Sequence, residues 1–153
     1  MALLLNAQEV ELLSALNEHG VRYIVVGGHA VVHYGHLRAT KDLDLWIEAT
    51  PENAERIAHA LEGLRFVLNP EQVKRLARPM LQMRLNTLHT ELLSDIAGLE
   101  FSEAMRQSVT AIEGGVQCHV LGLDDLIANK KLIGRDSDLQ DVAALESARA
   151  NAG

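Results

Sequence analysis

The hydrophobic residues of this chain recur at two spacings, which predict an alternation of helices and strands. Apolar positions three or four residues apart are typical of amphipathic helices, and short runs of β-branched and aliphatic residues are typical of buried strands. The helical spacing predicts helices over 7–19, 28–34, 51–62, 71–77, 101–107, 124–133 and 138–148. The strand pattern predicts strands over 22–26, 42–47, 81–86, 90–93, 109–112 and 116–120. We therefore expect a single α/β domain over residues 1–153.

Turn and capping residues mark the ends of several of these elements. Asn6 with Glu9 three residues later is typical of a capped helix start, and Thr50-Pro51 opens a helix in the same way. Gly20 and Gly134 are expected to end helices. Glu113-Gly114-Gly115 separates two strand-like runs and predicts a hairpin.

Composition and charge narrow the class of protein. Hydrophobic residues make up 48% of the chain and aromatic residues only 3%, so the core must be built mainly from aliphatic side chains. A formal net charge of -7 argues against a general affinity for nucleic acid backbones or anionic membranes. Cys118, the single cysteine, is expected to be buried and inert. The start has no basic segment of a signal peptide and no stretch reaches membrane-spanning length, so we expect a cytoplasmic protein.

Asp42 and Asp44 are the first candidates for chemistry. Side chains alternate along a strand, so these two carboxylates share one face, while Leu43, Leu45 and Ile47 point into the core. Two like charges on one face repel unless a cation lies between them, and oxygen ligands at this spacing suit Mg²⁺ or Mn²⁺. The alternative is an exposed strand edge whose charges are solvated.

The glycine pair Gly27-Gly28 follows the first strand and precedes a helix. Such a turn lets a phosphate approach backbone N–H groups closely. The third glycine of a dinucleotide-binding fingerprint and the lysine of a P-loop are missing, so neither motif is supported. Without the carboxylates that follow it, the segment is more typical of a plain strand-to-helix turn.

Gly27-Gly28, thirteen intervening residues and Asp42-x-Asp44 together resemble the signature of the nucleotidyltransferase superfamily related to DNA polymerase beta. The pattern is most similar to that of small AbiEii-like nucleotidyltransferases, over about residues 18–145. This resemblance implies a mixed β-sheet flanked by helices, with further helices at the C-terminus. Other matching positions are Arg38, Thr40, Glu91-Leu92-Leu93, Gly98, Phe101, Asp125-Leu126-Ile127, Lys130, Gly134-Arg135, Asp138 and Asp141.

The resemblance also implies a metal site of three carboxylates. Asp42 and Asp44 match the first two ligands, and Glu91 matches the third, which is usually an aspartate. Asp95 is the competing candidate for the third ligand. Gly27 and Gly28 would hold the phosphates, although the family more often has Gly-Ser, so a hydroxyl contact is missing here.

Further polar and basic residues are candidates for nucleotide binding. Arg38 is expected to contact phosphate, with Lys41 as a weaker candidate, and the alternative is a pair of solvated loop cations. Thr40 is expected near the nucleotide or as a cap on the strand entry. Lys130 would contact phosphate while Asp138 orients it; otherwise these charges form a surface network of small energetic value.

The implied reaction is transfer of a nucleoside monophosphate from a nucleoside triphosphate (NTP) to an acceptor hydroxyl, with release of pyrophosphate. The acceptor stays open among tRNA, a protein and a small molecule, and a partner protein or self-association also stays open. The alternative is a catalytically degenerate nucleotide-binding module in a toxin-antitoxin or phage-defence system. A phosphatase that uses Asp-x-Asp fits poorly, because the glycine turn would be unexplained.

Overall fold

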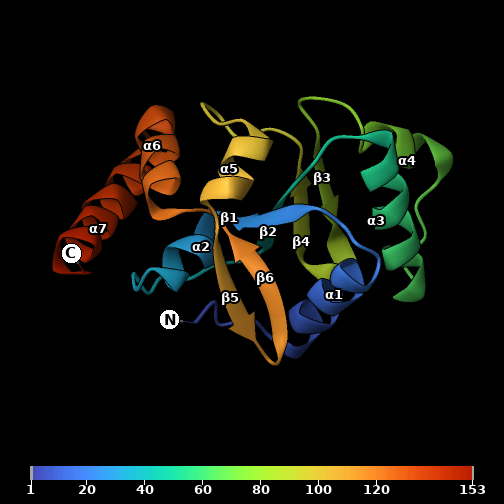
Figure 1. Ribbon diagram of the computed structural model, residues 1–153, viewed down its shortest axis with the longest axis horizontal. Coiled ribbons are helices and arrows are strands. Elements are labelled where there is room, and N and C mark those ends of the chain that lie inside the picture. Colours follow the sequence, from blue (N-terminus) through green and yellow to red (C-terminus); the bar gives the residue numbers. More distant parts are fainter. Residues whose placement is uncertain (1, 153) are drawn as a thin grey trace.

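The computed structural model describes residues 2–152 and contains a six-stranded mixed sheet with seven α-helices around it (Figure 1). The strand order is β3-β4-β2-β1-β6-β5. The strands are β1 (Tyr23–Val26), β2 (Leu43–Ile47), β3 (Gln82–Leu85), β4 (Thr90–Leu93), β5 (Val109–Glu113) and β6 (Val116–Val120). The helices are α1 (Ala7–Glu18), α2 (Gly27–His33), α3 (Pro51–Gly63), α4 (Pro70–Arg75), α5 (Phe101–Gln107), α6 (Leu123–Ile133) and α7 (Asp136–Ala152), with a 3-10 turn η1 (Asn86–Leu88). The expected α/β class is confirmed.

The sheet combines parallel and antiparallel pairs. β2 pairs with β1 antiparallel and with β4 parallel, and β1 pairs with β6 parallel. The hairpin partners β3–β4 and β5–β6 are antiparallel and form the two edges. β2 therefore lies inside the sheet, and residues at its start are flanked by β1 on one side and β4 on the other.

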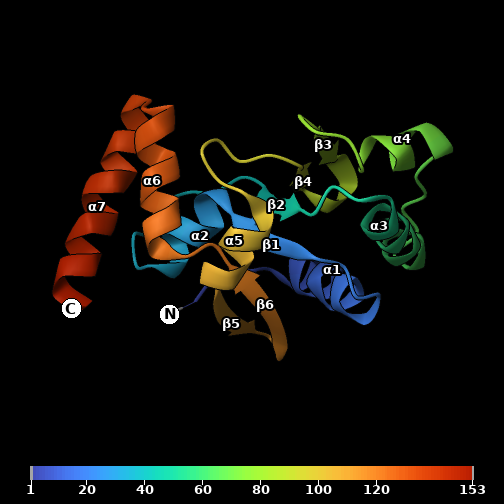
Figure 2. The ribbon, with the colours of Figure 1, turned by 45° about the horizontal axis from the view of Figure 1, so that its top comes forward.

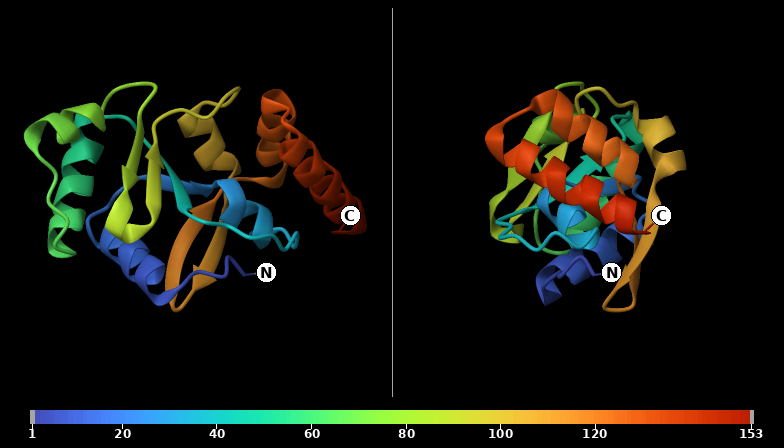
Figure 3. Two further views of the ribbon diagram at one scale, coloured as in Figure 1. Left: turned by 180° about the vertical axis from the view of Figure 1, so that it is seen from behind. Right: turned by 90° about the vertical axis from the view of Figure 1, so that its left-hand side faces the viewer.

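Two pairs of helices lie at opposite ends of the molecule. α6 and α7 pack side by side at one end, and α3 with α4 lies at the other (Figures 1 and 2). The same separation is seen from behind in Figure 3. α1 packs against α3 and β6, and α2 packs against β1 and β2. The candidate carboxylates before and on β2 are thus close to α2.

The local capping signals act as expected. Asn6 and Glu9 form a reciprocal capping box at the start of α1, and the Thr50 side chain accepts a hydrogen bond from Asn53 N at the start of α3. Gly114 and Gly115 both have positive φ and form the two-residue turn between β5 and β6. This backbone is that of the hairpin turns that glycine favours.

Some expected ends differ from the structure. The strand expected over 81–86 stops at Leu85, because Asn86–Leu88 forms the 3-10 turn that leads into β4. Glu113 pairs with Val116 inside the hairpin and does not belong to its turn. α7 begins two residues before, and ends four residues after, the expected helix over 138–148. Apolar spacing marks only the buried face of a helix, so it misses polar end turns.

The core is mostly aliphatic, with Trp46 as its largest member. Leu43, Leu45 and Ile47 are buried as expected. Trp46 is buried too; its ring packs edge-on against Phe101 and its Nε1–H donates to Ser94 O at 3.1 Å. Cys118 is buried, and burial raises the pKa of its thiol to about 11. Between residues 2 and 152, no helix has the length and apolar character required to cross a membrane.

Candidate functional site

Strand pairing places Asp44 of β2 directly beside Glu91 of β4. Their Cα atoms are partners in the parallel register, so both side chains stand on the same face of the sheet. Asp42 precedes β2 by one residue and contributes to the same cleft. This cleft has a volume of about 350 Å³ and is lined by Gly28, Arg38, Ala39, Thr40, Lys41, Asp42, Asp44 and Glu91. Most of the site residues expected from the sequence therefore lie around one hollow.

Asp44 is the most strongly perturbed acid of the cleft. Burial, followed by the negative charges of Glu91 and Asp42, raises the pKa of Asp44 to about 6. His29 and Lys130 act in the opposite direction without cancelling this effect. A carboxylate that is partly removed from water beside two others favours protonation or a cation. The negative charge of Asp44 is thus not fully compensated by the positive groups near it.

Gly27 makes room for the Asp44 carboxylate. Its φ of +67° is costly for residues with a side chain, and an added Cβ would lie 3.0 Å from Asp44 Cγ and closer still to Oδ2. Gly28 is similarly covered, because a Cβ there would lie 2.5 Å from Thr40 Cγ2. The first glycine brings the chain against the acid, and the second brings it against Thr40.

The carboxylates share a cleft but do not converge on one point. Among residues 2–152, no group of three or more His, Cys, Asp or Glu side chains is placed to hold a metal ion. Asp42 accepts two hydrogen bonds from Arg84, at 3.0 and 3.3 Å, and Glu91 accepts one from Gln82. In this arrangement two of the three acids bind side chains of β3.

Arg84 and Gln82 are site neighbours that the sequence pattern did not single out. Arg84 is the register partner of Glu91, and Gln82 lies two residues earlier on the same face of β3. Alternation of exposed and buried residues along β3 is a signal that both side chains leave the core. This alternation does not predict which acid Arg84 or Gln82 contacts.

The two candidates for the third carboxylate lie in different places. Glu91 lines the cleft beside Asp44. Asp95 follows the end of β4, where it accepts hydrogen bonds from Met80 N and from Ser94 Oγ at 3.3 Å. Position in the sheet therefore favours Glu91 over Asp95.

Lys130 belongs to a buried charge network on the C-terminal helices. Its Nζ lies 3.3 Å from Asp138 Oδ1 and 3.0 Å from Asp141 Oδ2, and all three residues are less than 8% exposed. Arg38 reaches the same network through Asp141 at 2.5 Å. The expected pairing of Lys130 with Asp138 is present. The alternative of a solvated surface network is wrong, because α6 and α7 pack together over these charges.

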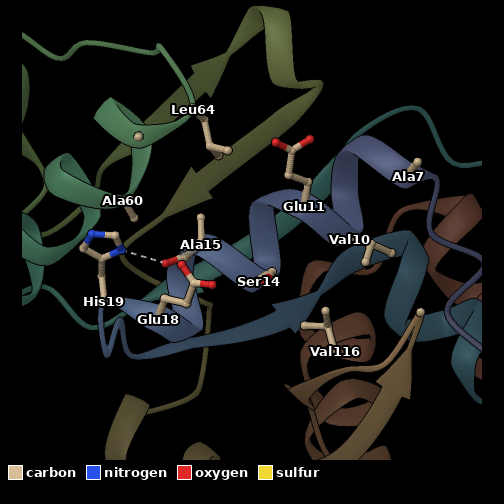
Figure 4. A pocket seen from close by; sticks show the side chains of 12 residues that line it. Ala7, Val10, Glu11, Ser14, Ala15, Glu18, His19, Ala60, Leu64 and Val116 are labelled. Carbon is tan, nitrogen blue, oxygen red and sulfur yellow. Dashed lines mark hydrogen bonds between the residues drawn. The ribbon is translucent and has the colours of Figure 1, made fainter.

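A larger hollow of about 520 Å³ lies between α1, α3 and the β5–β6 turn (Figure 4). Its His19 ring turns back on its own helix, with Nδ1 2.9 Å from Ala15 O. Glu11 and Glu18 lie two helical turns apart, so their carboxylates do not face a common point. We therefore assign the candidate site to the cleft at Asp44.

Comparison with known proteins identifies the family and the fold of the chain. The model of the family "Nucleotidyltransferase of unknown function" (DUF6036) matches residues 2–148. The fold is similar to the crystal structure of an antigenic nucleotidyltransferase-like protein from Paracoccidioides brasiliensis, with a TM-score of 0.58 and 14% identity over 92% of this chain and 77% of that chain. No curated protein matches the chain. The fold is thus nucleotidyltransferase-like, and the chain belongs to the DUF6036 family of nucleotidyltransferases of unknown function.

Proposed function

We propose that the protein transfers a nucleoside monophosphate from an NTP to a hydroxyl group of an acceptor and releases pyrophosphate. The observation that carries this proposal is the register pair Asp44–Glu91 in a cleft that Gly28 also lines, with Gly27 packed against the Asp44 carboxylate. The cleft also holds Arg38, Thr40 and Lys41, which can bind phosphate oxygens. Acids for the reacting centre and donors for a triphosphate therefore occur in one place.

The donor set of this cleft suits Mg²⁺ or Mn²⁺. Asp42, Asp44 and Glu91 offer hard carboxylate oxygens. Burial first, and then the negative charges of Glu91 and Asp42, raise the pKa of Asp44, and a cation would relieve the repulsion among these charges. When bound, such a cation supplies charge stabilisation at the phosphates and makes the acceptor hydroxyl more acidic. Asp42 would exchange its Arg84 partner for the cation, and Glu91 would exchange Gln82.

The side chains of the cleft have separate roles in the proposed reaction. Arg38 and Lys41 neutralise phosphate charge, while Gly27 and Gly28 let the phosphates approach the backbone. The acceptor oxygen forms a bond to the α-phosphorus as the bond to the β-phosphate oxygen breaks, and pyrophosphate leaves. Glu91 would accept the proton that the acceptor loses.

A transfer assay tests this proposal. With wild-type protein and Mg²⁺, we expect label to pass from an α-labelled NTP to an acceptor. With the double variant Asp42→Asn/Asp44→Asn, we expect no labelled acceptor. The exposed variant Glu62→Gln is a matched control for loss of an acid. Transfer that persists in the double variant would overturn the assignment of the site.

A nucleotide-binding module without catalysis is the second candidate. Two observations favour it: Asp42 and Glu91 already bind Arg84 and Gln82, and a glutamate stands at the third acid position. Calorimetry, which measures NTP binding, and the transfer assay together separate the two functions. Binding of NTP without transfer to tRNA, protein or small alcohols would favour the module, whereas transfer to any of them would exclude it.

The AbiEii-like subgroup, a role in toxin-antitoxin or phage-defence systems and a cytoplasmic location stay predictions from the sequence. The same holds for a partner protein or self-association. In the binding-module alternative, a partner would supply the surface that holds the acceptor or regulates the nucleotide. Size-exclusion chromatography with light scattering, with and without NTP, measures self-association directly.

A further inference from the structure

His29 is a buried polar side chain next to the cleft, and neither the metal site nor the phosphate contacts described above use it. It follows Gly28 in the chain and is 5% exposed. Its Nδ1 lies 3.1 Å from Leu3 O, and its Nε2 lies 3.4 Å from Glu9 Oε2. The ring is therefore held from both nitrogens by the segment around the start of α1.

Glu9 is held in position by the capping box at the start of α1. Its Oε1 accepts the hydrogen bond from Asn6 N at 2.9 Å that completes the capping box of α1, which leaves Oε2 for His29. Burial alone would lower the pKa of His29, but hydrogen bonds to Glu9 and Leu3 and the charges of Glu9 and Asp44 raise it. Both ring nitrogens face oxygen acceptors, which is the arrangement of a protonated imidazole.

Thr40 connects this pair to the cleft. Its Oγ1 lies 3.4 Å from His29 Nε2, and its side chain is part of the cleft lining. Its methyl group occupies the space that a side chain at Gly28 would need, since a Cβ there would lie 2.5 Å from Thr40 Cγ2. Thr40 thus covers the position from which a serine at residue 28 would act.

The direction of the hydrogen bonds decides what Thr40 can do. A hydroxyl has one proton to donate. If Nε2 of His29 carries a proton, that proton faces both Glu9 Oε2 and Thr40 Oγ1, each at 3.4 Å. The Thr40 hydroxyl then cannot donate to the ring, and its own proton is free for an acceptor in the cleft. If Nε2 is bare, the hydroxyl donates to the ring and is lost to a ligand. Glu9 favours the first arrangement because its carboxylate stabilises the protonated ring.

We propose that Thr40 donates the phosphate hydrogen bond that Gly28 cannot provide, and that Glu9 and His29 are positioning residues that direct the Thr40 proton into the cleft. The ligand is an anionic phosphate oxygen of the triphosphate, so this inference rests on the nucleotide-binding part of the proposed function. Thr40 would touch the ligand, whereas His29 and Glu9 act through Thr40.

Calorimetry with a non-transferable α,β-methylene NTP analogue and Mg²⁺ tests the hydroxyl. We expect Thr40→Val, which keeps the methyl packing, to bind about ten-fold more weakly, because a hydrogen bond to a charged group is lost. Thr40→Ser should bind like wild type. Equal binding of the valine variant and wild type would overturn the proposal.

A second-site rescue separates this role from a packing role. Thr40→Gly should weaken binding, and Gly28→Ser/Thr40→Gly should restore it, because the serine hydroxyl then fills the vacated space. Gly28→Ser alone should weaken binding through its clash with Thr40. A double variant no better than Thr40→Gly would contradict the idea that the two positions share one hydroxyl.

Glu9→Gln tests the positioning pair and keeps the capping box, since glutamine also serves at that position. We expect affinity to fall several-fold in this variant but to stay unchanged in Glu11→Gln on the exposed side of the same helix. In a Thr40→Val background, Glu9→Gln should have no further effect, because it acts only through the hydroxyl. If the affinity losses of Glu9→Gln and Thr40→Val add up in the double variant, Glu9 does not act through the Thr40 hydroxyl.

The binding experiments on Thr40 can be interpreted separately from the transfer assay of the proposed reaction. Weak binding by Thr40→Val with no transfer by wild type would support the hydroxyl and reject catalysis. A wild-type protein that does not bind the analogue would overturn both the reaction and this inference.

Discussion

Arg84 and Asp42 form a two-point ion pair between β3 and the segment before β2. Arg84 Nη2 donates to Oδ1 at 3.0 Å, and Nε donates to Oδ2 at 3.3 Å. A guanidinium matches a carboxylate in this fork-like geometry better than an ammonium does. The arginine therefore occupies both oxygens of an acid that we propose as a metal ligand.

Removing this arginine should strengthen metal binding. In Arg84→Gln the carboxylate of Asp42 is free, and a positive charge that opposes a cation is gone. The pair is exposed, so we expect a gain of only about three- to five-fold in affinity for Mn²⁺. Titration of Mn²⁺ followed by electron paramagnetic resonance measures this gain. Arg78→Gln, which breaks the exposed pair with Glu71, is the control, and weaker binding by Arg84→Gln would contradict the prediction.

Asp44 should make the stability of the metal-free protein depend on pH. Its pKa is about 6 in the folded protein, against an ordinary value of 3.8, so the folded state holds the proton more tightly than the unfolded state. The stability from this proton is full below about pH 4 and is lost as pH rises through about 6.

Asp44→Asn removes the cost of holding an ionised carboxylate at this buried position. In EDTA at about pH 7.5, we expect the variant to exceed wild type by about 1–2 kcal/mol in the free energy of unfolding, and by less at about pH 5. Urea unfolding at the two pH values measures the difference, with Glu62→Gln as control. A variant that is less stable than wild type at both values would show that Asp44 is stabilised by its surroundings.

Gly27 should tolerate no side chain, for two separable reasons. Gly27 and Gly20 share a φ of +67°, but an added Cβ meets the Asp44 carboxylate at Gly27 and has nothing within 4 Å at Gly20. Gly20→Ala should thus cost about 1 kcal/mol for backbone strain, and Gly27→Ala at least about 2 kcal/mol more for the clash. Thermal unfolding compares the two variants. Adding Asp44→Ala to Gly27→Ala should recover part of the excess, and equal losses in the two glycine variants would exclude the clash.

Lys130 should be far more important for stability than its neighbour Lys131. Lys130→Met leaves Asp138 and Asp141 buried with less compensating charge, for which we expect a loss of about 3 kcal/mol or more. Lys131 pairs with Glu146 at the surface, so Lys131→Met should cost less than about 1 kcal/mol. Chemical unfolding of both variants tests this contrast. Similar losses in the free energy of unfolding for Lys130→Met and Lys131→Met would mean that the buried charge network contributes little to stability.

Local sequence signals predicted the elements that depend on near neighbours. The capping box at Asn6 and Glu9, the helix start at Thr50-Pro51 and the hairpin at Gly114-Gly115 all involve residues within one turn of each other. Alternation along β2 placed Asp42 and Asp44 in one cleft for the same reason. The extra turns of α7 were missed because a polar helix end has no apolar period to mark it.

Only the tertiary structure decided which distant side chains meet. The register of β2 against β4 brings Glu91 to Asp44, and β3 brings Arg84 to Asp42, although these partners are more than forty residues apart in the chain. Packing of α6 on α7 also buries the charges around Lys130, for which a surface network was the alternative interpretation of the sequence.

The sequence by itself determined the order of elements, the aliphatic core, the glycine turn and the acids that follow it, because each depends on spacing along the chain. It also carried the resemblance to nucleotidyltransferases, through residues at fixed intervals. The contact of Thr40 with Gly28 and the line from Glu9 through His29 to the cleft depend on how α1, α2 and the loop before β2 pack. Such contacts arise from long-range burial and strand register, which no local pattern encodes.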